Sequence, residues 1–91
     1  MDNSFIKYTA NDIADLVYKK NADYGNSFDD TINKYGYVAY FIRIEDKLSR
    51  LRSLMLAGNT AQVKSEKVED TLKDIVGYTL LMLNNVNEGG N

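Results

Sequence analysis

The sequence is organised around Arg43-Ile44-Glu45-Asp46-Lys47-Leu48-Ser49-Arg50-Leu51-Arg52, in which six of the ten residues are ionisable. This charged stretch lies inside an apolar repeat that runs from Val38 to Met55. At about 100° per residue the apolar side chains of the repeat share one arc, which predicts a long helix from about Tyr37 to about Ala57. Gly58-Asn59 then follows, and this pair is typical of a helix C-terminus.

Two charged side chains project inside the apolar arc of this helix rather than opposite it. Glu45 and Arg52 fall beside Phe41 and Leu48, and burying them would cost several kcal/mol unless each finds a partner or an ion. The long helix is therefore either a salt-bridged surface or the wall of a polar pocket.

Length and composition exclude several classes of protein. The 91 residues suit one domain, residues 1–91, with a small core. Cysteine and histidine are absent, which excludes disulfides, zinc fingers, cysteine nucleophiles and Ser-His triads. The net charge of −2 gives no field that attracts a nucleic acid polymer. No apolar run approaches the roughly 18–20 residues of a membrane span, so we expect a cytoplasmic protein without membrane contacts.

The remaining segments predict three further helices. Thr9-Ala10-Asn11-Asp12 has the form of a capping box and predicts a helix from about Ala10 to about Asn21, after a lead-in over residues 1–8. Ser27 begins a short helix that ends at Gly36. Ser65 begins the last helix, which reaches about Val86 and leaves 87–91 as a frayed tail. Proline and strand alternation are absent, so the expected fold class is all-α, an antiparallel bundle of three to four helices.

The second half of the last helix is apolar on nearly every side. Tyr78, Leu80 and Leu81 point away from the face that carries Ile75, Met82 and Val86. A helix that is apolar all round is buried all round. In so small a chain this predicts a homo-dimer or homo-tetramer.

The charged residues allow two interpretations. Asp46 has Arg43 three residues before it and Arg50 four residues after it, which suits a solvated ladder of ion pairs. Asp70 and Asp74, however, are a like-charge pair four residues apart in the last helix, and a divalent cation such as Mg²⁺ would relieve their repulsion. Lys47, Arg50 and Arg43 could then bind phosphate oxygens, while Tyr24 and Tyr78 could stack on a base.

Three motifs carry a resemblance to a known family. They are Asp23-Tyr24-Gly25 with Ser27, Ile42-Arg43-Ile44-x-Asp46-Lys47-x-x-Arg50-Leu51, and Glu69-Asp70-x-x-x-Asp74-x-x-x-Tyr78. In these motifs the chain resembles the phage and prophage family called nucleotide modification associated domain 1, from about Lys19 to Leu83. That family is similar to the MazG-like all-α nucleotide pyrophosphohydrolases, which are helical dimers or tetramers that hold Mg²⁺ on a nucleoside triphosphate with carboxylates from two adjacent helices.

The resemblance implies roles for individual residues. It makes Asp46, Asp70 and Asp74 the metal ligands and Lys47 and Arg50 the phosphate-binding residues, and it places Asp23-Tyr24-Gly25 near the nucleotide. MazG-like enzymes usually carry Glu-x-x-Glu on one helix and Glu-x-x-Asp on the next. Here the carboxylate set is thinner, because Ser49 stands where a further acid would fall. Glu45 is the candidate for positioning the attacking water.

Two functions follow as expectations, with a third as the alternative to both. The first is a phage-type, Mg²⁺-dependent nucleoside triphosphate pyrophosphohydrolase that gives a monophosphate and pyrophosphate. The second is a non-catalytic nucleotide-binding protein that sequesters its ligand against host defence. The third is a structural or protein-interaction bundle in which the charges only solvate the surface.

Overall fold

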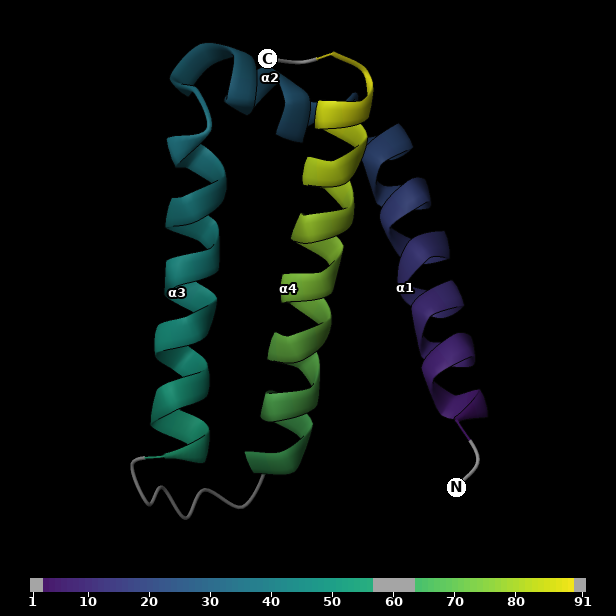
Figure 1. Ribbon diagram of the computed structural model, residues 1–91, viewed down its shortest axis with the longest axis vertical. Coiled ribbons are helices and arrows are strands. Elements are labelled where there is room, and N and C mark those ends of the chain that lie inside the picture. The colour runs from purple at the N-terminus through teal and green to yellow at the C-terminus, as the bar shows by residue number, and fades with distance from the viewer. Residues whose placement is uncertain (1–2, 57–63, 90–91) are drawn as a thin grey trace.

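A computed structural model describes residues 3–56 and 64–89. Over these residues the chain forms α1 (Ser4–Asp23), α2 (Ser27–Tyr35), α3 (Val38–Met55) and α4 (Lys64–Asn87), and no strand (Figure 1). The predicted all-α fold class is therefore confirmed.

The first helix begins at Ser4 rather than near Ala10, so the predicted capping box lies inside a helix. Residues 4–9 contain neither glycine nor proline, and nothing there interrupts the helix that Asn3 precedes. The expected lead-in over residues 1–8 is thus mostly helical. The helix ends at a turn in which Gly25 and Asn26 adopt positive φ angles of 64° and 62°. The side chain of Asn21 closes this turn by donating a hydrogen bond to Asn26 Oδ1 over 2.7 Å.

The other helices begin and end close to their predicted limits. Gly36, with a φ of 82°, separates α2 from α3, and its N–H donates to the carbonyl of Ile32 over 2.7 Å. The predicted cap at Gly58-Asn59 lies outside the described residues. The last helix continues through Asn87, so only the end of the expected tail follows it.

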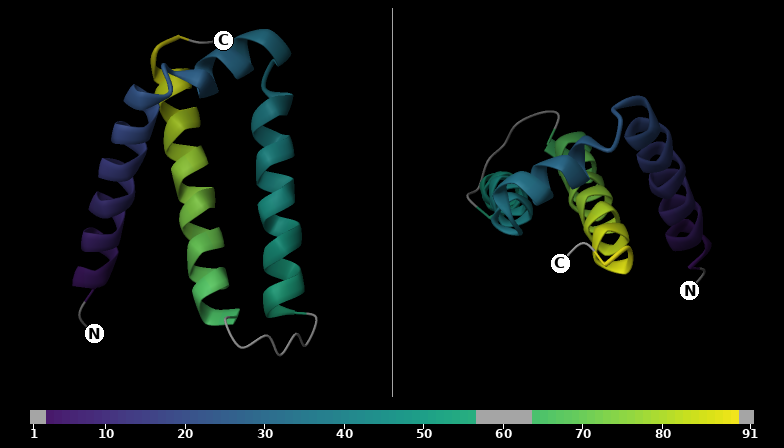
Figure 2. Two further views of the ribbon diagram at one scale, coloured as in Figure 1. Left: turned by 180° about the vertical axis from the view of Figure 1, so that it is seen from behind. Right: turned by 90° about the horizontal axis from the view of Figure 1, so that it is seen from above.

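The arrangement places α4 between α3 and α1, while α2 crosses one end of the layer (Figures 1 and 2). α4 packs against each of the other three helices. The predicted antiparallel arrangement holds for α3 and α4, but α1 and α4 run in the same direction because α2 crosses between α1 and α3 (Figure 1).

The buried core of this layer is small. Among the described residues the buried apolar side chains are those of Ile13, Ile32 and Leu54. Val38, Phe41 and Met55 belong to the apolar arc of α3 but are more than half exposed. The arc is therefore turned partly away from α4. None of the described helices has the length and apolar character needed to cross a membrane.

Two polar side chains of the described residues are also buried, and both lie on α4. Thr71 donates from its hydroxyl to the carbonyl of Lys67 over 2.7 Å. Asn85 donates from Nδ2 to Asp29 Oδ1 over 2.8 Å and so ties α4 to α2. The amide oxygen of Asn85 accepts no hydrogen bond from the described part of the chain.

Candidate functional site: a cleft between α1 and the α3–α4 pair

The space between α1 and the α3–α4 pair contains a cavity of about 510 Å³, which we call the cleft. α2 contributes Ser27, Phe28, Thr31 and Ile32 to its lining. The remaining lining comes from one face of α1 with Tyr24, from Ala39 and Arg43 of α3, and from one face of α4. Its volume lies within the range of about 300–1,000 Å³ that small-molecule sites occupy.

The α1 wall of the cleft is built from residues that recur every three or four positions. Thr9, Asp12, Leu16 and Lys20 all line the cleft, and this spacing puts them on one face of the helix. The face brings both an acid and a base to an otherwise apolar wall. Thr9 belongs to this face because α1 begins at Ser4, before it.

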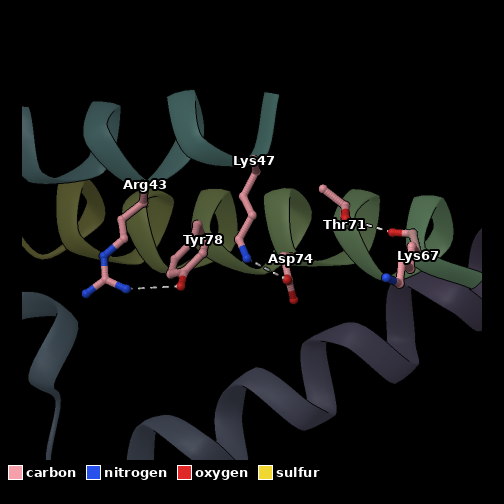
Figure 3. Close-up of polar contacts among 6 residues, drawn as sticks. All are labelled: Arg43, Lys47, Lys67, Thr71, Asp74 and Tyr78. Carbon is pink, nitrogen blue, oxygen red and sulfur yellow. Dashed lines mark hydrogen bonds and ion pairs between the residues drawn. The ribbon is translucent and has the colours of Figure 1, made fainter. Parts of the chain in front are cut away.

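The opposite wall carries an arginine held against a tyrosine. Arg43 donates from Nη1 to the hydroxyl of Tyr78 over 3.2 Å. The centre of its guanidinium lies 5.6 Å from the centroid of the Tyr78 ring, in the range of a cation–π contact. Figure 3 shows both side chains directed toward the side of α4 where α1 lies. The guanidinium is thus positioned at the cleft, and most of its N–H donors have no partner among the residues that the structure describes.

Next along the same wall, an ion pair joins α3 to α4. Lys47 Nζ lies 3.0 Å from Asp74 Oδ2, and Asp74 also lines the cleft (Figure 3). The side chains are 26% and 51% exposed, so water screens the pair. Such a pair contributes only about 0.2–1 kcal/mol to folding. Asp74 can therefore exchange Lys47 for another cation at little cost.

A second ion pair lies within α4. Lys73 Nζ lies 3.0 Å from Glu69 Oε1, and Lys73 lines the cleft. The hydrogen bond to Glu69 and the negative charge of that carboxylate raise the pKa of Lys73 above its ordinary value of 10.5, and the charges of Asp70 and Asp12 add to this. Lys73 is therefore a fixed positive charge at neutral pH.

The structure brings some of the predicted site residues to the cleft. Arg43, Asp74, Tyr78 and Tyr24 line it, and Lys47 binds Asp74 beside it. The others do not line it and are exposed: Glu45, Asp46, Arg50, Asp23 and Asp70. Glu45 lies outside because it is about 160° round the helix from Arg43, whereas Asp46 has nearly the same angular position as Ala39 but lies two turns further along α3. The predicted role of Glu45 in positioning water thus has no geometric support at the cleft.

The three predicted metal ligands are not brought together. Among the side chains that the structure describes, those of residues 3–56 and 67–89, no group of three or more His, Cys, Asp or Glu is close enough to hold a metal ion. Asp74 faces the cleft, whereas Asp46 is exposed on α3 and Asp70 lies near Lys73. The structure therefore does not provide the predicted set of Asp46, Asp70 and Asp74 within one chain.

Sequence reasoning missed the contribution of α1 and α2 to the cleft. Asp12 was assigned only to a helix cap and Lys20 had no role at the site, and Thr31 and Lys73 were not singled out. The one available signal was the spacing of Asp12, Leu16 and Lys20, which places them on one helical face. These residues face α3 because of the direction in which α2 turns the chain. No local sequence pattern reveals that direction.

A comparison with protein-family models decides the relationship of this chain. The model of the family described as Nucleotide modification associated domain 1 matches residues 20–85. The chain belongs to this family. The part matched by Nucleotide modification associated domain 1 contains every predicted site residue but leaves out Thr9, Asp12 and Leu16 of the cleft. Searches among curated proteins and among solved structures gave no match.

Proposed function

We propose that the cleft binds a nucleotide. The observation that carries the proposal is the guanidinium of Arg43, fixed against the Tyr78 ring at the wall of a cavity of about 510 Å³. An arginine positioned in this way is suited to bidentate contact with phosphate oxygens. Membership of a family associated with nucleotide modification supports the same ligand class.

The distribution of side chains suits the two ends of a nucleotide. Arg43 and Lys20 offer positive charge for the phosphates, from α3 and α1 respectively. Tyr24 and Tyr78 offer ring faces on which a base can stack. Ser27 and Thr31 of α2 add hydroxyl groups that can accept or donate hydrogen bonds to a sugar.

Magnesium enters the proposal only together with the nucleotide. Mg²⁺ keeps several waters and is commonly held by one or two carboxylates plus substrate phosphates. The cleft offers two carboxylates, Asp74 from α4 and Asp12 from α1. Either could bind a Mg²⁺ ion that arrives on the phosphates, which would neutralise their charge.

Between binding and hydrolysis, the geometry favours binding without turnover. The described side chains of one chain contain no convergent set of three acids, whereas the resemblance to MazG-like enzymes implies Mg²⁺ held by carboxylates from two adjacent helices. A protein that sequesters a nucleotide therefore ranks before a pyrophosphohydrolase. Hydrolysis, if present, would consist of water attack on the α-phosphorus with release of pyrophosphate.

Two assays on the same protein test the proposal. A thermal-shift screen of ribo- and deoxyribonucleotides with and without Mg²⁺ should raise the melting temperature for at least one ligand, because binding to the folded state stabilises it by mass action. Incubation of that ligand with the protein and Mg²⁺ should leave it intact. A stoichiometric release of monophosphate and pyrophosphate would instead establish the enzyme, and the absence of any thermal shift would contradict nucleotide binding.

A further inference from the structure

An exposed stripe runs the full length of α3 on the side away from the cleft. Its members alternate three and four residues apart, which is the spacing of the helix seam in a coiled coil. All are exposed: Val38, Phe41, Glu45, Leu48, Arg52 and Met55. Phe41 alone is 59% exposed. A seam of this kind normally faces another helix, yet in the single chain nothing described covers it.

The position of the stripe follows from the contacts of α3 with α4. Tyr40 faces α4, since its hydroxyl lies 2.8 Å from Thr79 Oγ1. Arg43 lies about 60° round the helix from Tyr40 and lines the cleft, whereas Phe41 lies about 100° round in the opposite direction. The stripe is therefore separated from the cleft by the α3–α4 contact.

α4 presents a matching apolar stripe on the same side. Its members are Leu72, Val76, Leu83 and Val86, which are between 41% and 61% exposed. They lie about 80–160° round the helix from Tyr78, the cleft residue, and Leu72, Val76 and Leu83 lie beyond the angle of Thr79, which contacts Tyr40 of α3. We call the two stripes together the back face. Contiguous apolar surface of this kind marks an interaction site.

The charged residues within the back face indicate which partner binds it. Neither Glu45 nor Arg52 has an ion-pair partner in the described part of the chain. If a second copy pairs antiparallel about a two-fold axis at the level between Leu48 and Ser49, Glu45 lies opposite Arg52 of the partner subunit. The same axis pairs Arg52 with Glu45 of the partner subunit, so two ion pairs form. Parallel pairing would instead set like charges side by side at both levels.

We infer that the back face is the interface of a homodimer in which α3 pairs antiparallel with α3 of a second copy, with Glu45 and Arg52 exchanged across a two-fold axis. The interface is isologous, since one patch meets its own copy. The apolar stripe of α4 lies beside α3 and is covered by the same association. The cleft stays open on the opposite side, so the dimer does not depend on the proposed nucleotide binding.

Charge reversal tests both the interface and its symmetry. Sedimentation velocity of the full chain over a concentration series should show a dimer for the wild-type protein. Glu45→Arg alone, or Arg52→Glu alone, sets two like-charge contacts across the axis, and each contact should weaken association about tenfold, giving about a hundredfold in the dimer dissociation constant. The double variant Glu45→Arg/Arg52→Glu restores both pairs and should return the constant to within about threefold of the wild-type value.

Matched controls lie on the same helix outside the stripe. Asp46→Arg and Arg50→Glu change the net charge by the same amounts and should leave association unchanged. Circular dichroism should show equal helicity for all variants, because the altered side chains are exposed. A wild-type chain that stays monomeric, single reversals that leave the dimer intact, a double variant that fails to restore it, or controls that dissociate equally would each overturn the inference.

Discussion

At the scale of single residues, Arg43 connects the fold to the proposed chemistry. It belongs to α3, yet its guanidinium rests on Tyr78 of α4, so the position of the charge depends on the packing of two helices. An arginine on a flexible surface loses side-chain entropy when it binds an anion. The Tyr78 ring has already removed part of that freedom, which prepares Arg43 for a ligand.

Replacing Arg43 tests this role. Hydrogen bonds to a charged group contribute about 1.5–3 kcal/mol, so Arg43→Ala should weaken nucleotide binding about tenfold to a hundredfold in calorimetry. Arg43→Lys should recover only part of the loss, because an ammonium cannot make the bidentate contact. Arg50→Ala is the matched control, since Arg50 is on the same helix but outside the cleft, and it should bind as the wild type does. Equal losses for both arginines would place the ligand elsewhere.

Asp74 provides a residue-scale test of magnesium. Its ion pair with Lys47 is half exposed, so Asp74→Asn should change the free energy of unfolding by less than about 1 kcal/mol. Nucleotide binding measured without Mg²⁺ should be unchanged or tighter, since a negative charge leaves the cleft. Any increase in affinity that Mg²⁺ gives the wild-type protein should be lost.

The corresponding variant Asp46→Asn distinguishes Mg²⁺ binding at the cleft from Mg²⁺ binding by the set of acids predicted from the sequence. Asp46 does not line the cleft, and the variant should keep the full response to Mg²⁺. If Asp46→Asn abolishes the Mg²⁺ response as completely as Asp74→Asn, then Asp46 and Asp74 do act together in Mg²⁺ binding, as the predicted set of Asp46, Asp70 and Asp74 requires.

At the scale of helices, α1 forms a wall of the cleft because α1 approaches α4 closely. Gly77 is buried on α4, and a Cβ atom added there would lie 3.3 Å from Cγ2 of Val17. Glycine inside a helix otherwise costs about 0.5–1 kcal/mol relative to alanine. The glycine is accounted for by the proximity of α1.

A double-mutant cycle measures this approach. In the wild-type background Gly77→Ala gains helix propensity but crowds Val17, so the two effects should largely cancel in the free energy of unfolding. In the background of Val17→Ala the crowding atom is gone, and Gly77→Ala should stabilise the protein by about 0.5–1 kcal/mol. Equal effects in the two backgrounds, measured by urea unfolding, would mean that α1 does not rest on α4 at this point.

The hydrogen bond between Asn85 of α4 and Asp29 of α2 is tested by replacing its donor with a carboxylate. Asn85 is buried and donates to Asp29, so Asn85→Asp brings a second carboxylate against the first. An uncompensated buried charge of this kind should destabilise the fold by about 3–5 kcal/mol at neutral pH. Burial and the like charge raise the folded-state pKa of the introduced carboxyl, so its cost is absent below the unfolded pKa of about 3.9 and grows as the pH rises above it.

The exchanged pair Asp29→Asn/Asn85→Asp serves as the control. It keeps one amide and one carboxylate in contact and should recover most of the lost stability in thermal unfolding at neutral pH. If Asn85→Asp alone is as stable as the wild type, the side chain of residue 85 is not buried against α2.

The helices that could be predicted from sequence are those whose signals are local. The apolar period of α3 and α4 gave their limits to within a few residues, and Gly36 separated α2 from α3. The beginning of α1 was placed too late, because a capping pattern at Thr9 resembles a start although the preceding residues are equally able to form a helix. Arg43 and Asp74 could be found from the charge patterns of the two helices and Tyr78 from its aromatic ring, but no local pattern showed that Arg43 and Tyr78 touch. Asp46 and Arg50 were assigned to a site that they do not line, because each lies two helical turns beyond a lining residue of α3, Ala39 and Arg43 respectively.

At the scale of the whole molecule, the chain is an open layer of helices with little interior. Its described apolar core consists of three side chains, while both α3 and α4 leave apolar stripes exposed on the back face. The cleft and the back face lie on opposite sides of the α3–α4 pair. One side is therefore available to a ligand while the other is available to a second copy, and the two proposals can be tested separately.

The proposed function depends on the cleft as the place where a nucleotide binds, and an amide chemical-shift titration tests this directly. The titrant is the nucleotide that gives the largest thermal shift. The backbone amides of Asp12–Lys20 in α1, of Ala39–Arg43 in α3 and of Lys73–Tyr78 in α4 should move together and saturate, while those of Met55 and Val86 on the back face stay in place. Saturating shifts confined to the back face, or no shifts in the three cleft segments, would contradict it.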